Sequence, residues 1–477
     1  MFSIGGLGVR ISAVFRRIAP DPLVIAILLT FLTAMIALIW GRYDASDQSL
    51  LDRAEHLLDA WRFVETVEAA KQVGIWKFLE FSMQMCLILV TGHALAVTTP
   101  IQRLIDRLAA IPRSTAQAAA MIGFVAAVAA LLNWGLGLIV GALLARDVAR
   151  SMERRGIRAH YPLLCAAGYM GLIIWHGGLS GSAPLKMTSY AEAVKIIPAE
   201  YLGQLGGRGV PLTETVFSMQ NLIITGGMLI IIPVLLFMLA PSRSQDVQTI
   251  GNHRVPAPEL AENPRDEGET LPDKLDRSRI IAWLLAIVLL VALARWIMSE
   301  GNWKSAGLNQ VNVFMLAMGL LLHGSALSYM NAAAEGARGC AGIIIQFPLY
   351  AGIMGMMAAS GLISQIAEWF ASIGNEQTIP LLSYLAAGIV NLFVPSGGGQ
   401  WGIQGPIALQ TGMSAGVSPG AMIMSVAYGD QLTNMLQPFW ALPLLAITGV
   451  RARDIVGYTA IIMVVVGAWM ALGMLLF

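Results

Sequence analysis

Charged side chains are scarce in this sequence. Asp, Glu, Lys and Arg make up 12% of its 477 residues, against 56% hydrophobic residues. A soluble domain typically carries about 25% charged residues, so this chain cannot cover a water-facing surface. Runs of about 20 apolar residues, enough to cross a hydrocarbon core about 30 Å thick, recur along it. The composition therefore predicts an all-α polytopic membrane protein that is embedded in the lipid bilayer.

Several other features are missing, and each excludes a class of function. The 30 basic and 29 acidic residues leave a net charge of +1, which argues against a nucleic-acid partner. No Gly-Lys-Ser or Gly-Lys-Thr follows the glycine run at 397–399, so nucleotide hydrolysis has no support. The three cysteines, Cys86, Cys165 and Cys340, lack metal-type spacing and are interpreted as buried, inert thiols.

An intramembrane enzyme is not expected either. Such an enzyme needs a nucleophile with a base, and Ser396 has no evident His or Lys partner in the sequence. With no enzyme and no nucleotide-binding domain indicated, the sequence favours secondary transport.

Apolar runs of two kinds organise the chain. Uninterrupted runs predict ordinary spans at residues 22–40, 81–97, 161–175, 217–239, 280–298, 311–322, 343–359 and 455–477. Three others are broken at mid-depth by Asn, Gly, Pro and Ser, at 118–143, 381–409 and 421–447. The breaks fall near Asn133, at 395–400 and at 430–438.

A polar segment divides the chain into two similar halves. Residues 241–278 are rich in Asp, Glu, Arg, Pro and Asn, which predicts a hydrophilic cytoplasmic linker between a first repeat, 1–240, and a second, 279–477. Short amphipathic helices are expected at 101–108 and 363–370. Matching features are separated by slowly drifting offsets: 262 positions from Ile101 to Ile363, 258 from Asn133 to Asn391, and 254 from Pro184 to Pro438.

Basic clusters set the expected topology. Lys and Arg favour cytoplasmic loops, and Arg residues gather at 10–17, 103–113, 146–158 and 451–453. A cytoplasmic N-terminus then makes 118–143 a re-entrant hairpin bent at 133–137. With 280–298 as an added span, the second half is inverted, and its hairpin bends at 395–399. No cleavage site follows the first apolar run, so that run is expected to be a retained membrane helix.

The broken segments are the candidate binding site. Freed backbone groups are costly in lipid, so these segments should converge on a protein interior. Half-helix N-termini can then face an anion and unwound carbonyls a cation. The candidate substrate residues are Asn133, Trp134, Gly135, His176, Gly177, Gly178, Ser180, Gly181, Ser182, Pro395, Ser396, Gly397, Gly398, Gly399, Gln400, Trp401 and Gln437. Any one of these runs alone is more typical of helix packing or a kink.

Accumulating a monovalent anion against a negative interior costs about 2.3 kcal/mol per 100 mV, so a coupling cation is expected. The candidate coupling residues are Asn133, Ser182, Asn391, Ser396, Asp430, Thr433 and Asn434. Their oxygens suit Na⁺, whereas Asp430 could carry H⁺ instead. The alternatives are purely structural: the side-chain amides cap broken helices, and Asp430 is a structural carboxylate.

These motifs, taken in order, resemble the bacterial short-chain fatty acid transporter family, the acetoacetate and butyrate permeases. The segments that carry the resemblance are Val90-Thr91-Gly92-His93-Ala94-Leu95, Asn133-Trp134-Gly135, Ser180-Gly181-Ser182, Val394-Pro395-Ser396-Gly397-Gly398-Gly399 and Gln437-Pro438-Phe439-Trp440-Ala441-Leu442-Pro443. The resemblance implies uptake of a short monocarboxylate, inverted repeats with paired hairpins, and a homodimeric elevator within a wider ion transporter superfamily. No cofactor is implied beyond Na⁺ or H⁺. The alternative is a cation/proton antiporter of similar architecture that uses Asp430.

Overall fold

The computed structural model describes residues 4–43, 49–62, 74–194, 197, 208–253, 255, 270–300 and 308–477. Within these ranges the secondary structure is entirely helical. Seven helices are long and apolar enough to cross a membrane: Pro22–Trp40, Gly74–Ala96, Thr115–Leu132, Met219–Met238, Arg279–Ser299, Ala326–Ala359 and Ala452–Leu476. The expected all-α polytopic membrane protein is confirmed.

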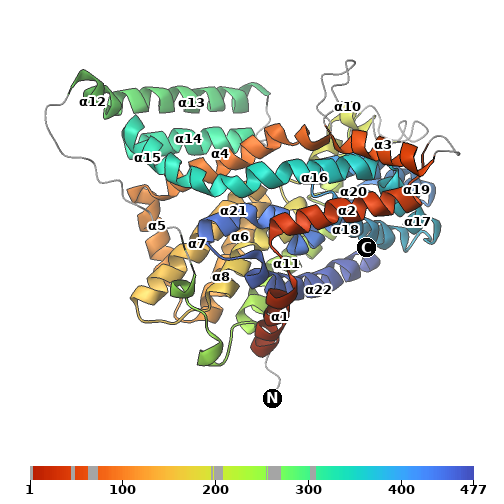
Figure 1. Ribbon diagram of the computed structural model, residues 1–477, viewed down its shortest axis with the longest axis horizontal. Coiled ribbons are helices and arrows are strands. Elements are labelled where there is room, and N and C mark those ends of the chain that lie inside the picture. The colour runs from red at the N-terminus through yellow and green to blue at the C-terminus, as the bar shows by residue number, and fades with distance from the viewer. Residues whose placement is uncertain are drawn as a thin grey trace.

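Long helices from both halves form one layer, which runs across Figure 1. It contains α2 (Pro22–Trp40), α4 (Leu79–Ala96), α14 (Leu308–His323) and α16 (Ala341–Ala359). Helix α2 packs on α16 and α14 packs on α4, so each half covers the long helix of the other. Asp21 caps α2, accepting a hydrogen bond from the Leu23 amide, and Pro22 occupies its first turn.

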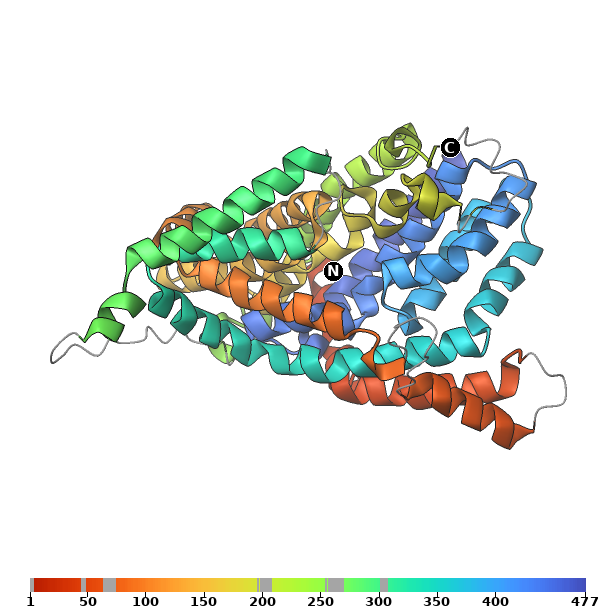
Figure 2. The ribbon, with the colours of Figure 1, turned by 90° about the horizontal axis from the view of Figure 1, so that it is seen from above.

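Shorter helices extend this layer. Helix α3 (Leu50–Trp61) and the 3-10 turn Gly74–Trp76 pack on α16, and α15 (Ala326–Ala337) leads into α16 through the turn Arg338–Cys340. The run at 280–298 forms α13 (Arg279–Glu300), which packs on α14 at the rim of the molecule (Figure 2). Only 11% of its apolar stretch is buried. An outer helix with this little protein contact is suited to face lipid.

Both expected amphipathic helices are present. They are α5 (Thr99–Ala110) and α17 (Leu362–Ser372), and they lie at opposite ends of the molecule in Figure 1. Ile105 of α5 and Ile363 of α17 are buried, whereas Arg103 and Trp369 on the same helices are exposed. Each helix therefore covers one end of the bundle with its apolar face.

Two helical hairpins follow these helices. The first joins α6 (Thr115–Leu132) to α7 (Trp134–Arg154), and the second joins α18 (Ile379–Phe393) to α19 (Gly397–Ser414). The bends lie where the sequence predicted them. The Asn133 side chain accepts from the amides of Gly135 and Leu136, and Ser396 accepts from that of Gly399. Each bend is thus the N-cap of the returning helix.

The first broken helix is longer than expected, and the prediction of an ordinary span at 161–175 was wrong. Helix α8 (Tyr161–Gly168) gives way to 3-10 turns at Met170–Ile173 and Trp175–Gly177, and α9 (Ser182–Met187) follows. Residues 161–178 are all buried. Their apolarity reflects enclosure by protein on every side, which an apolar run does not distinguish from contact with lipid.

The second broken helix breaks later than predicted. Helix α20 (Pro419–Thr433) continues through Asp430, and only Asn434–Leu436 forms a 3-10 turn before α21 (Pro438–Thr448). The break lies within the predicted range 430–438 but begins four residues after Asp430, because Asp430 and Gln431 are polar residues of a regular helix turned toward the interior. Gln437 and Pro438 do stand at the junction.

Two terminal spans enclose these segments. Helix α11 (Met219–Met238) packs on α6, and α22 (Ala452–Leu476) packs on α11 and on α1 (Ile4–Ile18). Small helices at Tyr190–Ala193 (α10), Leu212–Glu214 and Leu271–Asp276 (α12) complete the described chain.

The beginning of the linker is ordered against the rest of the protein. It holds short turns at Ser244–Asp246 and Ile250–Asn252. The Tyr161 amide donates to the Gln248 carbonyl at 2.8 Å, and Ile250 is buried. Residues 254 and 256–269 of the predicted linker lie outside the described residues.

Candidate substrate and ion site

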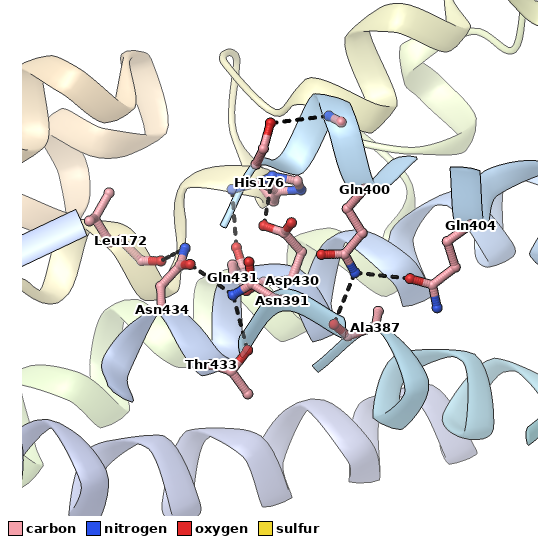
Figure 3. Close-up of polar contacts among 12 residues, drawn as sticks. Leu172, His176, Ala387, Asn391, Gln400, Gln404, Asp430, Gln431, Thr433 and Asn434 are labelled. Atoms are coloured by element: carbon pink, nitrogen blue, oxygen red, sulfur yellow. Dashed lines mark hydrogen bonds and ion pairs between the residues drawn. The ribbon is translucent and has the colours of Figure 1, made fainter. Parts of the chain in front are cut away.

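The broken helices of the two halves meet at a buried histidine and aspartate (Figure 3). His176 lies in the turn Trp175–Gly177, and Asp430 lies on α20. His176 Nε2 is 3.4 Å from Asp430 Oδ1, and the two side chains are 1% and 4% exposed. The next residue, Gln431, uses its Oε1 to accept from the His176 amide at 3.0 Å. Adjacent residues of α20 thus hold both the ring and the backbone of His176.

Asn391 is the centre of a second set of contacts, on the far side of Asp430. Its Nδ2 lies 2.7 Å from the Asp430 carbonyl, 3.0 Å from Thr433 Oγ1 and 2.9 Å from Asn434 Oδ1. Asn434 Nδ2 donates to the Leu172 carbonyl at 3.2 Å. Asn391, from the second hairpin, therefore holds the break of the second half, and Asn434 links that break to the first half at Leu172.

Gln437 closes this network from the start of α21. Its Nε2 donates to the carbonyls of Asn391 and Leu392, at 3.1 and 2.7 Å. Tyr169 donates its hydroxyl toward the carbonyls of Asn434 and Gln437, at 2.8 and 3.1 Å. Backbone groups freed by the breaks thus find side-chain partners, as a protein interior requires.

Several buried oxygens at the network have no hydrogen-bond partner among the described residues. They are Asn391 Oδ1, Asp430 Oδ2 and Gln437 Oε1, and Gln400 Oε1 is unpartnered beside the network. An unmet buried polar atom costs about 1–3 kcal/mol. Oxygens of this type are the ligands that hard cations prefer. The set is chemically suited to hold a proton or a small cation.

Unpartnered donors lie on the neighbouring aromatic side. Trp175 Nε1, Trp440 Nε1 and the Tyr350 hydroxyl are buried and make no hydrogen bond within the described chain. Their rings belong to one cluster: Trp134 is 6.0 Å from Trp175 and 5.2 Å from Trp440, and Tyr350 is 5.0 Å from Phe439, between ring centroids. Aromatic walls with a few convergent donors fit a carboxylate that bears a short apolar tail.

The tip of the second hairpin lies against the histidine. A Cβ on Gly397 would stand 2.7 Å from His176 Nε2 and 3.3 Å from the Trp175 ring. Such a distance is below normal contact, so only glycine permits this approach. Gly398 is held from outside, because Lys186 Nζ donates to its carbonyl at 3.3 Å.

The tip of the first hairpin is fixed by the loop that follows Gly177. Ser180 Oγ accepts from the Trp134 amide at 2.9 Å, and a Cβ on Gly178 would clash with the Leu131 carbonyl. The sequence predicted that backbone amides at the hairpin tips bind an anion. Several of these amides already donate to Ser180 or to the capping side chains of Asn133 and Ser396. The side-chain donors of the aromatic cluster are therefore the better candidates for carboxylate contacts.

The structure brings the predicted residues together unequally. His176, Asn391, Asp430, Thr433, Asn434 and Gln437 share one contact network, which Gly397 adjoins. Gly181 abuts the His176 carbonyl. Asn133 with Gly135, and Ser396 with Gly399, form the hairpin caps, while Pro395 precedes the second cap and Ser182 begins α9. Gln400 donates to Ala387 and Gln404, and Trp401 is fully buried beside them in α19.

Sequence reasoning missed other residues around the site. Asn221 of α11 donates to the Gly177 carbonyl at 2.9 Å and accepts from the Tyr428 hydroxyl at 2.8 Å. Asn221 is a polar residue within an apolar run, a signal that was available. Lys186 lies two positions beyond the glycine-rich motif. Tyr169 and Tyr350 carried no signal, since tyrosine is common in apolar helices.

Comparison with known proteins identifies the family. The model of the short chain fatty acid transporter family matches residues 3–477. The chain belongs to this family. A relative from Escherichia coli (strain K12) is 36% identical over 99% of this chain and 100% of its own length. Another, from Haemophilus influenzae, is 35% identical over 92% of both chains. Both are provisionally named short-chain fatty acid transporters.

Membership of the short-chain fatty acid transporter family confirms the resemblance read from the motifs and the conclusion that this is a transporter rather than an enzyme. The cation/proton antiporter alternative is not favoured. Among solved structures, the Alcanivorax borkumensis YdaH transporter is 16% identical with a TM-score of 0.43, covering 96% of this chain and 97% of its own. Neisseria gonorrhoeae MtrF is also 16% identical, with a TM-score of 0.40, and the match covers 98% of this chain and 97% of the MtrF chain. Such scores are too low to establish a shared fold.

Proposed function

We propose that this protein is a cation-coupled symporter that carries short-chain monocarboxylates, such as butyrate or acetoacetate, across the bacterial inner membrane. The observation that carries the proposal is the set of buried, unpartnered donors and acceptors at the broken helices and the adjoining aromatic cluster. The aromatic cluster holds unpartnered donors at Trp175, Tyr350 and Trp440, the network holds unpartnered acceptors at Asn391, Asp430 and Gln437, and both ring nitrogens of His176 between them also make no hydrogen bond with the described residues. An anion and a cation satisfy the two sets together.

Electrostatics explains why the two ligands travel together. A carboxylate entering beside an ionised, buried Asp430 meets like-charge repulsion that the surrounding protein screens weakly. Na⁺ or H⁺ at Asp430 removes that repulsion, so each ligand raises the affinity for the other. The charge of the same cation also cancels the electrical work of anion uptake, which is about 2.3 kcal/mol per 100 mV of membrane potential. Of the predicted coupling residues, Asn391, Asp430, Thr433 and Asn434 form this site in our proposal, and Asn133, Ser182 and Ser396 serve the helix ends around it.

We further propose an elevator movement within a homodimer. The two hairpins and the two broken helices would move as one unit against a scaffold of long helices. Reciprocal packing of α2 on α16 and α14 on α4, with α5 and α17 at opposite ends, supports two inverted repeats at 1–240 and 279–477. The amphipathic α5 and α17 are suited to lie at the two membrane interfaces as connecting arms. A cytoplasmic N-terminus and linker complete this arrangement.

Substrate recognition is tested by counterflow in proteoliposomes, with labelled butyrate outside and unlabelled compounds inside. Acetate, butyrate and acetoacetate should support exchange, whereas butyramide, which has the same tail and no charge, should not. Trp175→Phe keeps an aromatic side chain, although a smaller one, and removes Nε1, which should raise KM about 10- to 100-fold, because a hydrogen bond to a charged group contributes about 1.5–3 kcal/mol. Trp369→Phe, on exposed α17, is the matched control. Equal exchange of butyramide and butyrate would overturn carboxylate recognition.

A further inference from the structure

A second polar region lies away from the His176–Asp430 site. A cavity of about 540 Å³ separates the long helices α4 and α16 from α7, α21 and the start of α22. Four arginines line it: Arg146, Arg338, Arg451 and Arg453. Three of them come from the clusters at 146–158 and 451–453 that are expected to be cytoplasmic. The cavity is therefore a vestibule on the cytoplasmic side in the proposed topology.

Most charged groups of the vestibule lining already have partners. Arg146 pairs with Asp147 at 2.8 Å, and Arg451 pairs with Asp454 at 3.3 Å. The lining carboxylates are occupied too, since Asp21 caps α2 and Glu335 lies 3.3 Å from His93 Nε2. Arg453 is half-buried and makes no hydrogen bond or ion pair with the described part of the chain. A guanidinium placed in this way is suited to bind an oxyanion.

The other wall of the vestibule is apolar. Leu89 of α4 and Leu442, Leu445, Ala446 and Ile447 of α21 form it. Gln346 adds a buried side-chain amide whose Oε1 has no partner in the described residues. An apolar bed opposite guanidinium groups matches a ligand with a carboxylate head and a short hydrocarbon tail.

A narrow cleft of about 40 Å³ continues from the vestibule toward the buried site. Pro20, Ala452 and Arg453 line both spaces. The far end of the cleft is lined by Tyr169 and Gln437, which belong to the network around Asn391. Arg453 thus stands at the junction between the vestibule and the route to the site.

We infer that the vestibule is a second binding site for short monocarboxylates, anchored by Arg453, at which substrate dwells on the cytoplasmic side of the transport site. This inference rests on the proposed function for its choice of ligand. It assigns to the protein two carboxylate sites of different character. The buried site uses neutral donors beside a cation, and the vestibule uses the permanently charged guanidinium of the half-buried Arg453.

Thiol labelling of the purified protein tests the inference without transport. Ala446→Cys and, separately, Gly342→Cys place reporters in the vestibule wall, where a Cβ on Gly342 meets only ordinary contacts. The native cysteines are buried, so the unsubstituted protein gives the background. Butyrate at about ten times its dissociation constant should slow labelling about tenfold, because about one-tenth of the vestibules stay empty. Butyramide should give no protection.

Variants assign the protection to Arg453. Arg453→Gln should shift protection to about 10- to 100-fold higher butyrate, the loss expected for a hydrogen bond to a charged group. Arg103→Gln, at an exposed position of α5, is the matched control and should leave the butyrate concentration needed for protection unchanged. Protection must persist with Trp175→Phe, since that change affects the other site. Butyrate transport without protection at either reporter overturns this inference alone, whereas protection without butyrate transport overturns the proposed function alone.

Discussion

His176 Nε2 lies 3.4 Å from Asp430 Oδ1, and the two residues come from opposite halves of the chain. Both are enclosed by protein, on segments that leave regular helical structure within a few residues. A proton or cation gained at Asp430 changes its interaction with His176, which in turn touches the tip of the second hairpin at Gly397. In the proposed mechanism, occupancy of the ion site is thereby linked to the position of the hairpin.

Neutralising Asp430 should uncouple transport. Asp430→Asn keeps the size of the side chain and removes its charge, so we expect concentrative uptake of butyrate to be lost while exchange of butyrate across the membrane is retained. Uptake and counterflow in the same proteoliposomes measure the two activities. Asp106→Asn, an exposed carboxylate on α5, is the control. If Asp430→Asn still accumulates butyrate with unaltered ion dependence, Asp430 is structural.

Gly397 should tolerate no side chain. In Gly397→Ala the new Cβ would lie 2.7 Å from His176 Nε2, so the hairpin tip must move. Overpacking of this kind costs about 1–3 kcal/mol, and we expect a reduced rate of butyrate exchange with normal expression. Gly402→Ala is the matched control in the same helix, since nothing lies within 4 Å of its added Cβ. Equal loss in both variants would show a general effect on α19 instead.

The breaks at Asn133 and Ser396 were predictable because capping residues and glycines at mid-depth leave a local signal. Asp21-Pro22 marked the start of α2 for the same reason. The span expected at 161–175 could not be corrected from the sequence, since apolar residues suit both lipid and a protein interior.

The partners within the site were less accessible to sequence reasoning. Asp430 and Asn391 stood out as polar residues in apolar surroundings, but their contact with each other and with His176 depends on how two distant helices cross. Free donors at Trp175 and Trp440 could not be foreseen, because a tryptophan in a membrane protein is more often an interfacial anchor.

A cysteine at the tip of the second hairpin should report the elevator movement. Gly398 is half-buried, and its added Cβ would meet only the flexible end of Lys186, at 3.2 Å. We expect Gly398→Cys to react with membrane-impermeant reagents from either side, depending on the imposed substrate and ion gradients. Reaction from a single side under every gradient would exclude an elevator.

The contacts of His160 should weaken in acid. Burial, and next the Arg16 guanidinium, lower the pKa of His160 to about 3. Its Nδ1 accepts from the Gln248 amide at 3.0 Å and its Nε2 faces the Tyr458 hydroxyl at 2.8 Å, so the ring is held neutral. The unfolded chain binds a proton near pH 6.5 and the folded one does not, so stability is full above that pH and falls as the pH drops toward 3.

Thermal unfolding of the purified protein between pH 7 and pH 5 measures this effect. His160→Asn keeps an acceptor and cannot be protonated in that range, so its Tm should fall less steeply with acidification than that of the unsubstituted protein. Parallel slopes would assign the acid sensitivity to other groups.

Gradient-driven uptake is the most direct test of coupled transport. Labelled butyrate is supplied to proteoliposomes with an inward gradient of Na⁺ alone, of H⁺ alone, or of neither, at clamped membrane potential. We predict accumulation above the external concentration with one of the two gradients, a return to equilibrium when that gradient is collapsed, and loss of the accumulation in Asp430→Asn. Equilibration to the same level under all three conditions would contradict cation-coupled symport.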